Sequence, residues 1–289
     1  MKIVEAHLVN AFTSNGSGGN PAGVVLHADD LSNEEKLSIA QAVGYSETAF
    51  VSQDEEVDYA LSFFTTTGEV DFCGHATLAA FSTMYQSGVV TNGKYIQRTK
   101  AGILEVNISE TGHIVMDQQL PQYRDVLSYE AISELIGLEP SILESTYLPV
   151  EVVSTGLPDI IVPVPSGYLD KIKVNHKLTS DFCKRHEVIG IHAFELCDES
   201  SKLTASCRNF APLFGISEES ATGSASGALA CYLTKHLYQG SSKRFTFEQG
   251  RAMDCISTIT ASVDSSEGGI KRVRVGGFAD KIGMQKVAL

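Results

Sequence analysis

Two short stretches of this chain decide its fold: Phe72–Ala79, which reads Phe-Cys-Gly-His-Ala-Thr-Leu-Ala, and Ala221–Ala225, which reads Ala-Thr-Gly-Ser-Ala. In each stretch a glycine precedes an apolar run rich in small residues, a pattern typical of helices buried among sheets. A helix N-terminus presents unpaired backbone N–H groups and the positive end of the helix dipole. We therefore expect Gly74 and Gly223 to begin two buried helices whose first turns can bind a carboxylate or an oxyanion.

The surroundings of these two stretches repeat along the chain. Gly74 is followed after 28 residues by Gly102, and Gly223 is followed after 27 residues by Gly250. The shared order of strand, glycine, helix and glycine-led strand predicts two duplicated domains that face each other across a cleft. The segment 109–129 is the expected first crossover between these domains.

Strand patterns are more frequent than helix patterns, so the expected fold class is α+β. The expected strands cover residues 3–12, 23–27, 48–51, 59–64, 102–108, 113–116 and 160–164. The expected helices cover residues 32–43, 76–85, 128–136 and 224–237. Ser32 stands three residues before Glu35, which is the spacing of a capping box at the start of the first helix.

The composition of the 289-residue chain excludes several classes of protein. Hydrophobic residues make up 43% and charged residues 20%, which is ordinary for globular domains and excludes general disorder. The net charge of −13 disfavours nucleic acids and anionic membranes as partners. No stretch reaches the roughly 18 apolar residues of a membrane span. Glu5 and His7 interrupt any signal peptide, so we expect a cytoplasmic protein.

Three near matches to cofactor motifs each fail at a decisive residue. Gly190 stands where a zincin helix needs its second histidine, and Tyr95 stands where a P-loop needs serine or threonine. The run 16–21 lacks the third glycine of a dinucleotide fingerprint. The six cysteines form no Cys-x-x-Cys pair, so a zinc ribbon is excluded as well. We expect neither a metal nor a nucleotide cofactor.

Glu47, His75 and the pair Glu218–Glu219 are the candidates for moving protons. Glu47 lies at the mouth of an apolar strand, where loss of water should raise the pKa of its carboxyl toward that of a proton shuttle. The alternative for Glu47 is an exposed position on a loop. His75 can share a proton with such a carboxylate, although a histidine beside a glycine is also commonly structural. Glu218 and Glu219 precede the second helix, and a solvated surface pair is the alternative for them.

Several motifs together resemble the PhzF-type family of phenazine biosynthesis isomerases. They are the two helix entrances, the stretch Ser46–Val51 (Ser-Glu-Thr-Ala-Phe-Val) and the stretch Gly19–Ala22 (Gly-Asn-Pro-Ala). The late stretch Val275–Ala279 is similar to the closing strand of that family. The motifs follow the family's order, so the resemblance covers nearly the whole chain.

The resemblance implies a fold like that of diaminopimelate epimerase. Two pseudo-symmetric domains would each curl a β-sheet around a central helix, and the active site would lie in the cleft between them. The last strand would return to the first domain, which would comprise residues 1–118 and 275–289, and the second domain would comprise residues 119–274. Proteins of this type are typically homodimers that need no cofactor and no metal.

The resemblance also implies a cofactor-independent isomerase that shifts a proton on a small carboxylate-bearing metabolite. Glu47 matches the family's catalytic acid/base, and His75 and Glu219 would orient Glu47 or the polar groups of the substrate. The implied substrate-binding residues surround the two helix entrances: Asn20, Cys73, Gly74, Gly223 and Ser224.

Glu219 departs from the family pattern, which usually has an aspartate at this place. The extra methylene moves the carboxylate by about 1.5 Å, one carbon–carbon bond. We therefore expect a smaller or differently shaped substrate, and we expect Glu219 to help keep Glu47 protonated. The alternative is that Glu219 turns outward and that Glu218 or another group takes its role.

Two other functions remain open from the sequence. A racemase of the same fold uses a thiol at both helix entrances, and this chain has Cys73 at the first entrance but Thr222 at the second. A hydroxyl is too weakly acidic to replace a thiol in such chemistry. A small-molecule-binding protein that has lost catalysis is the alternative of another class.

Overall fold

The computed structural model describes residues 2–238 and 242–289, which have an α+β fold rich in strands. The chain forms two compact units. Unit 1 comprises Met1–Asp117 and Gly276–Leu289, and unit 2 comprises Gln118–Val275. The chain passes from one unit to the other within strands β8 (Ile114–Gln118) and β17 (Gly269–Ala288).

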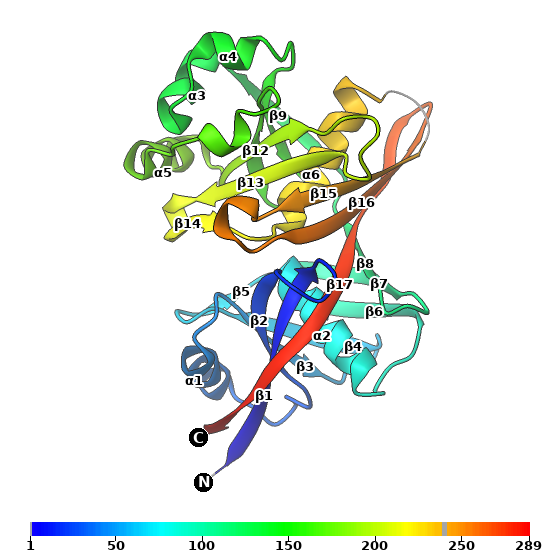
Figure 1. Cartoon of the computed structure of the whole chain (residues 1–289). Helices are drawn as coiled ribbons and strands as arrows, with labels where there is room; N and C mark the ends of the chain where they lie inside the picture. The colour runs from blue at the N-terminus through cyan, green and yellow to red at the C-terminus, as the bar shows by residue number, and fades with distance from the viewer. Residues whose placement is uncertain (1, 239–241) are drawn as a thin grey trace. The chain divides into compact units, whose positions relative to one another are not determined.

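Unit 1 is a mixed sheet packed on one buried helix, α2 (Gly74–Gln86), as Figure 1 shows. Its strands pair in the order β17-β1-β2-β3-β4-β6-β7-β8, and β5 pairs with β4. The pairs β2–β3 and β4–β6 are parallel, and the others are antiparallel. The remaining bounds are β1 (Ile3–Thr13), β2 (Asn20–Val25), β3 (Thr48–Ser52), β4 (Tyr59–Phe64), β5 (Glu69–Val70), β6 (Gly93–Thr99) and β7 (Gly102–Ile108).

Helix α1 (Asn33–Val43) begins at the predicted capping box. The backbone N–H of Glu35 donates to the Ser32 hydroxyl at 3.2 Å, and the Ser32 N–H donates to the Glu35 carboxylate at 2.8 Å. Gly44 ends the helix with φ of 74°, a conformation that glycine adopts without steric cost. The helix packs on β3 and β4, on the outside of unit 1.

Unit 2 is a second mixed sheet packed on its own buried helix, α6 (Gly223–His236). The strands pair in the order β9-β10-β11-β12-β13-β15-β16, with β14 on β13, and the pairs β11–β12 and β13–β15 are parallel. Their bounds are β9 (Gln122–Leu127), β10 (Val150–Ser154), β11 (Pro158–Pro163), β12 (Gly190–Leu196), β13 (Ala205–Ala211), β14 (Ile216–Glu219), β15 (Lys243–Gln249) and β16 (Ser257–Ser266).

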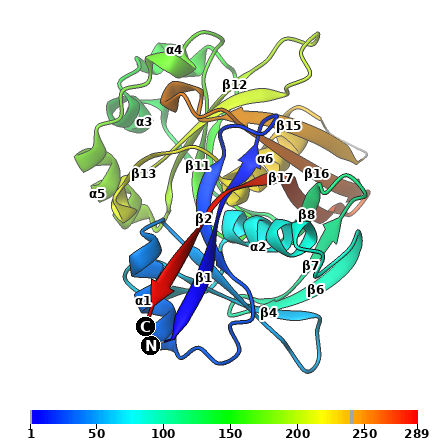
Figure 2. The same cartoon turned by 60° about the horizontal axis from the view of Figure 1, so that its bottom comes forward.

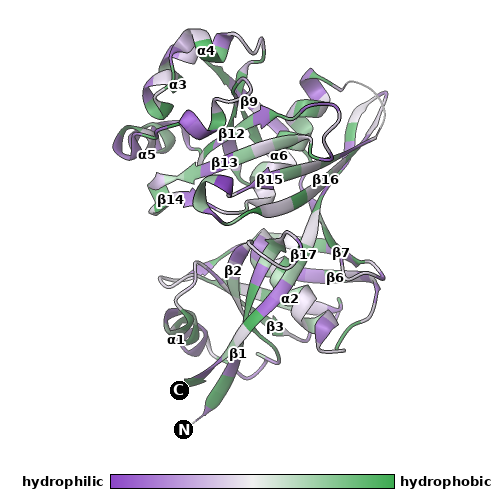
Figure 3. Cartoon of the chain, viewed as in Figure 1, coloured by the Kyte–Doolittle hydropathy of each residue, from purple (hydrophilic) through white to green (hydrophobic). Residues whose placement is uncertain are grey.

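Further helices cover part of unit 2 and enclose an apolar cluster that includes Ile132, Leu143 and Phe182. Helices α3, α4 and α5 gather at one end of the unit (Figures 1 and 2). Their bounds, with those of three short 3-10 helices, are α3 (Tyr129–Ile136), α4 (Pro140–Glu144), α5 (His176–His186), η1 (Leu169–Lys171), η2 (Pro212–Phe214) and η3 (Arg251–Met253). Helix α5 is mostly hydrophilic (Figure 3), and its buried residues Thr179, Phe182 and Cys183 lie three to four residues apart, as expected of a helix with one face in solvent.

The two units share one order of elements and pairings. The run β2-α1-β3-β4-β5-α2-β6-β7 of unit 1 matches the run β11-α5-β12-β13-β14-α6-β15-β16 of unit 2 in order and in the sense of each pairing. Gly74 and Gly223 are the first residues of the matching helices α2 and α6. Within the part of the chain that the structure describes, none of the helices has both the length and the apolar character needed to cross a bilayer.

Candidate active site

The start of α2 carries the first group of site residues. Cys73 is the N-cap residue of this helix, but its side chain makes no capping hydrogen bond. Gly74 follows as the first helical residue and His75 as the second, as the sequence predicted. The Thr77 hydroxyl donates to the Cys73 carbonyl at 2.8 Å and holds the first turn in place. A helix start of this kind can bind an anion through its backbone N–H groups.

Glu47, His75 and Cys73 converge at this helix start. The His75 Nε2 lies 3.3 Å from the Glu47 carboxylate, and the His75 Nδ1 lies 3.4 Å from the Cys73 Sγ. The side chains of His75 and Glu47 are only 7% and 19% exposed, so water screens their charges weakly. The structure therefore joins the predicted acid/base to the predicted histidine, and Glu47 is not the exposed loop residue of the alternative.

Glu47 is held by the neighbouring strands. Its carbonyl accepts the backbone N–H of Gly23 at 3.0 Å, directly before the parallel pairing of β2 with β3. A side chain at Gly23 would come within 2.6 Å of the Thr48 hydroxyl, so a glycine is needed for β2 to approach here. Asn20 is buried at the start of the same strand β2, opposite Ala11. Both Asn20 and Glu47 thus stand at one end of the β2–β3 pair.

The pKa of Glu47 is lowered in the structure, whereas the sequence predicted that it would be raised. Burial by itself would raise the pKa of Glu47, but the close imidazole of His75 outweighs burial and lowers this pKa below its ordinary value. Burial likewise opposes the proton on His75, but Cys73 and Glu47 raise the pKa of His75 well above its ordinary value. Burial raises the pKa of the Cys73 thiol, whereas the pKa of Glu47 is lowered, so of these two neighbours Glu47 is the one that ionises first and supplies the negative charge. The resting pair is a carboxylate beside an imidazolium.

The same three side chains are also the one group of candidate metal ligands among the described residues. One ligand atom from each of Glu47, Cys73 and His75 lies within 4.8 Å of the others. Thiolate, imidazole and carboxylate are donors that zinc accepts. In this structure, however, the three groups are already paired with one another through one proton-bearing imidazole.

The start of α6 carries the second group. Thr222 is the N-cap residue, Gly223 is the first helical residue, and Ser224 follows half-buried. The buried side chain of Gln249 holds this entrance by three hydrogen bonds. Its Oε1 accepts from the Thr222 N–H at 3.2 Å. Its Nε2 donates to the Thr222 hydroxyl at 3.0 Å and to the Glu219 carbonyl at 2.7 Å. Gln249 was not among the predicted site residues, although it directly precedes Gly250 in the repeat.

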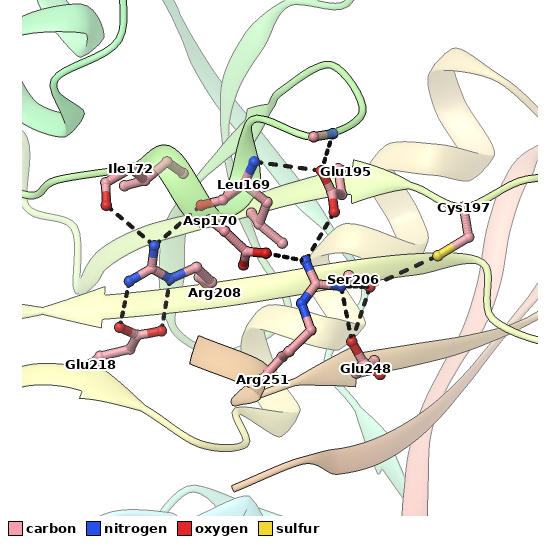
Figure 4. A network of polar contacts seen from close by, with 11 residues as sticks. Leu169, Asp170, Ile172, Glu195, Cys197, Ser206, Arg208, Glu218, Glu248 and Arg251 are labelled. Atoms are coloured by element: carbon pink, nitrogen blue, oxygen red, sulfur yellow. Dashed lines mark hydrogen bonds and ion pairs between the residues drawn. The ribbon is translucent and has the colours of Figure 1, made fainter. Parts of the chain in front are cut away.

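Glu219 and Glu218 have different partners. The Thr222 hydroxyl donates to the Glu219 carboxylate at 2.6 Å, so Glu219 lies against the start of α6. Glu218 instead forms a bidentate ion pair with Arg208, with N–O distances of 2.7 and 2.8 Å (Figure 4). A carboxylate bound in this way is held on Arg208, which disfavours the alternative in which Glu218 takes the role of Glu219.

A second arginine anchors the segment that follows Gln249. Arg251 contacts three carboxylates from different parts of unit 2, those of Asp170, Glu195 and Glu248 (Figure 4). A side chain at Gly250 would come within 2.9 Å of the Ser220 carbonyl, so this segment packs tightly against the α6 entrance. The arginine network thus supports the loop that places Gln249.

A buried polar cluster of β11–β13 was also missed from the sequence. Asp159, His192 and Asn209 are each at most 1% exposed. The Asn209 amide lies 3.3 Å from the His192 Nδ1, and Glu219 pairs with Asn209 in the β13–β14 ladder. The sequence signal for this cluster is the aspartate directly before the apolar run 160–164, where the expected strand begins two residues later than β11.

Comparison with known proteins gives consistent results along the whole chain. The family model described as phenazine biosynthesis-like protein, PhzC-PhzF, matches residues 9–282. The chain is 33% identical over 285 residues to the uncharacterized isomerase YfhB of Bacillus subtilis, covering 94% of both chains. It is 29% identical to the trans-2,3-dihydro-3-hydroxyanthranilate isomerase of Pseudomonas chlororaphis, covering 98% of both.

Solved structures agree with these relatives. The PhzF-family protein of Bacillus anthracis superposes with a TM-score of 0.92 at 30% identity, covering all of both chains. A hydroxyproline epimerase from Agrobacterium vitis shares the fold alone, with a TM-score of 0.63 at 11% identity. The chain therefore belongs to the PhzC–PhzF family of phenazine biosynthesis-like proteins and is an isomerase.

Proposed function

We propose that this isomerase shifts a proton between carbons of a small carboxylate-bearing metabolite without a cofactor or a metal, and that Glu47 is its acid/base. The contact between Glu47 and His75 at the start of α2 carries the proposal. Because His75 lowers the pKa of Glu47, the resting enzyme holds a carboxylate, which is the form that accepts a proton.

The proposed reaction has two proton transfers. Glu47 takes a proton from a substrate carbon, the C–H electron pair moves into the adjacent conjugated system, and Glu47 then returns the proton to another carbon. The N–H groups at the start of α2 stabilise the negative charge that develops between these steps. His75 is a positioning residue, since its contact with Glu47 fixes the carboxylate and keeps it charged until the substrate proton arrives.

Unit 2 is proposed to bind the carboxylate of the same substrate. Gly223 and Ser224 begin a helix of the same kind as α2, and Gln249 fixes the orientation of that entrance. The matching order of elements in the two units supports a duplicated, pseudo-symmetric pair of domains. The family resemblance supports a homodimer, which light scattering on the purified protein would test.

A two-thiol racemase is the weaker candidate. Cys73 is present, but its raised pKa leaves it protonated at neutral pH. Thr222 occupies the matching place in α6, and its hydroxyl donates to Glu219. A thiol on one side and an engaged hydroxyl on the other do not form a pair of exchanging acids.

The proposal is tested by finding a substrate and then removing the base. Small carboxylates are screened for a rise in melting temperature, and each that binds is tested for isomerisation. Glu47→Gln should reduce kcat by at least about 100-fold, since general base catalysis contributes on this order, while Glu55→Gln on an exposed loop should match the parent. Full turnover by Glu47→Gln would refute the assignment, and binding without any isomerisation would favour a non-catalytic binding protein.

A further inference from the structure

The strand that leads into α6 carries two adjacent glutamates with different partners. Glu218 and Glu219 are the last residues of β14, and consecutive residues of a strand point to opposite faces of the sheet. The Thr222 hydroxyl at the start of α6 donates to Glu219, whereas Glu218 pairs with Arg208. A shift of β14 by one residue would exchange the places of the two glutamates. The register of β14 therefore decides which carboxylate reaches the α6 entrance.

The backbone of β14 specifies this register only weakly. The strand is four residues long and pairs with β13 at two positions, Asn209 with Glu219 and Ala211 with Ile216. The register shifts between these two positions, so the ladder is irregular. A short strand with an irregular ladder has few backbone hydrogen bonds that resist a slip. Side-chain contacts are thus needed to hold β14 in its register.

Arg208 makes the contact that distinguishes Glu218 from Glu219. Its Nε and Nη2 donate to the two Glu218 oxygens at 2.8 and 2.7 Å, and its Nη1 donates to the carbonyls of Leu169 and Ile172 at 3.1 and 3.2 Å (Figure 4). The side chains of Arg208 and Glu218 are only 12% and 14% exposed, so water screens their charges weakly. The planar guanidinium binds one carboxylate in one orientation.

The η1 segment that accepts from Arg208 is held independently by other residues. One oxygen of the Glu195 carboxylate accepts the backbone N–H groups of Gly167 and Leu169 at 2.8 and 3.4 Å. Arg251 donates to the other Glu195 oxygen at 3.0 Å (Figure 4). Because none of these bonds involves Arg208, the segment is a fixed support from which Arg208 reaches β14.

The corresponding place in unit 1 is apolar. In the matching ladders β12–β13 and β3–β4, Arg208 opposite Ala193 corresponds to Leu61 opposite Val51. Leu61 is buried. The matching strand β5 reads Glu69–Val70, so it has no pair of adjacent glutamates to distinguish. The fold therefore does not require an arginine at this place, and the arginine accompanies the two glutamates of unit 2.

We propose that Arg208 is a positioning residue that fixes the register of β14, so that Glu219 and not Glu218 reaches the start of α6. In this register the Glu219 carboxylate accepts the Thr222 hydroxyl at 2.6 Å, and the Glu219 carbonyl accepts the Gln249 amide at 2.7 Å. A slip of one residue would break both contacts and displace the first turn of α6. The inference rests on the proposed function in one respect: it takes the α6 entrance to bind the substrate carboxylate.

A double substitution removes the ion pair without leaving a buried charge behind. Methionine is unbranched like both side chains and carries no charge, so Arg208→Met with Glu218→Met should keep the melting temperature within about 3 °C of the parent. The matched control is Arg274→Met with Asp264→Met, which removes an ion pair of 2.6 Å between β16 and β17 of the same unit.

Amide hydrogen exchange, measured by NMR, tests the α6 entrance without any substrate. The Thr222 N–H donates to Gln249, so its exchange rate should rise by at least about tenfold in the double variant and stay at the parent's value in the control. The Gly44 amide at the end of α1 should exchange equally in all three proteins. An unchanged Thr222 rate would overturn the role of Arg208, whether or not the proposed reaction is correct.

Kinetics then connect the entrance to substrate binding. In the double variant KM should rise by roughly 10- to 100-fold, since misplacing a group by about 1 Å costs on this order, and kcat should change by less than about threefold. Faster exchange at Thr222 with an unchanged KM would support the role of Arg208 in β14. It would at the same time overturn the α6 entrance as the carboxylate site of the proposed function.

Arg208→Lys tests the guanidinium by a single substitution that keeps the charge. The lysine places a positive charge beside Glu218, but one ammonium group cannot bond both carboxylate oxygens and both η1 carbonyls. The Thr222 exchange rate and KM should therefore rise as in the double variant, each by about threefold or more. Parental values of both quantities in Arg208→Lys would overturn the proposal.

Discussion

At the scale of single residues, the imidazole of His75 decides how Glu47 titrates. The sequence marks both residues as candidates for moving protons, and the structure brings them into contact. The direction expected for the pKa of Glu47 was wrong, since burial was visible in the apolar strand but the 3.3 Å contact with His75 was not. A neighbour's charge depends on distance, which a sequence pattern does not contain.

Replacing His75 should therefore move the pH profile of the enzyme. In His75→Gln the carboxyl of Glu47 loses the positive partner that lowers its pKa, so the acid limb of kcat/KM should shift to higher pH. The rate at neutral pH should fall by roughly 10- to 100-fold. His176→Gln, at the exposed start of α5, should match the parent. An unshifted acid limb would show that His75 does not control Glu47.

The group Glu47, Cys73 and His75 also gives a prediction about metal removal. Because His75 already lies 3.3 Å from the Glu47 carboxylate and 3.4 Å from the Cys73 thiol, dialysis against EDTA should leave turnover within about twofold of the untreated enzyme. Metal content is measured before and after dialysis. Loss of activity that Zn²⁺ restores would contradict a metal-free reaction and would identify these three residues as ligands.

At the scale of elements, the start of α6 depends on a buried amide from another strand. Gln249→Leu removes the bonds to Thr222 and Glu219 and leaves their buried polar groups without this partner. The free energy of unfolding should fall by about 2 to 4 kcal/mol. Gln53→Leu, at an exposed position, should change it by less than about 0.5 kcal/mol. Urea unfolding of both variants measures this difference, and equal stabilities would refute it.

The buried histidine of β12 predicts how stability depends on acid pH. Burial lowers the pKa of His192 in the folded protein from its ordinary 6.5 to about 3. Between these two pH values the unfolded chain therefore binds a proton on this histidine and the folded protein does not. The contribution of His192 to stability is constant above about pH 6.5 and becomes unfavourable as the pH drops toward 3. From pH 7.5 to pH 5 the loss due to His192 should be about 2 kcal/mol. His192→Phe, which copies unit 1, should lose less by about this amount, and an equal loss in both proteins would contradict this prediction.

The elements themselves were only partly predictable. The capping box of α1 and the glycine starts of α2 and α6 were confirmed, because these signals are local. Strands β12 and β13 were missed, since strands buried on both faces lack the alternation that marks a half-exposed strand. Their polar residues His192 and Asn209 made them appear less apolar still.

At the scale of the whole molecule, the repeat of strand, glycine, helix and strand was readable from spacing alone. Each unit contains that run with the same sense of pairing. The sequence did not reveal that Asp159, His192 and Asn209 lie together in a buried polar cluster, because they stand on three separate strands that only the β11–β12 and β12–β13 pairings bring together. Motifs within one element were predicted, and contacts between elements were not.

Solvent exchange at the substrate carbon tests the central claim, that Glu47 moves the proton. The isomerisation is run in heavy water with the parent, Glu47→Gln and Glu55→Gln, and the product is analysed by NMR and mass spectrometry. The parent and Glu55→Gln should place deuterium at the carbon that gains the proton, and Glu47→Gln should place none over the same time. Parental deuterium incorporation by Glu47→Gln would show that another group is the base.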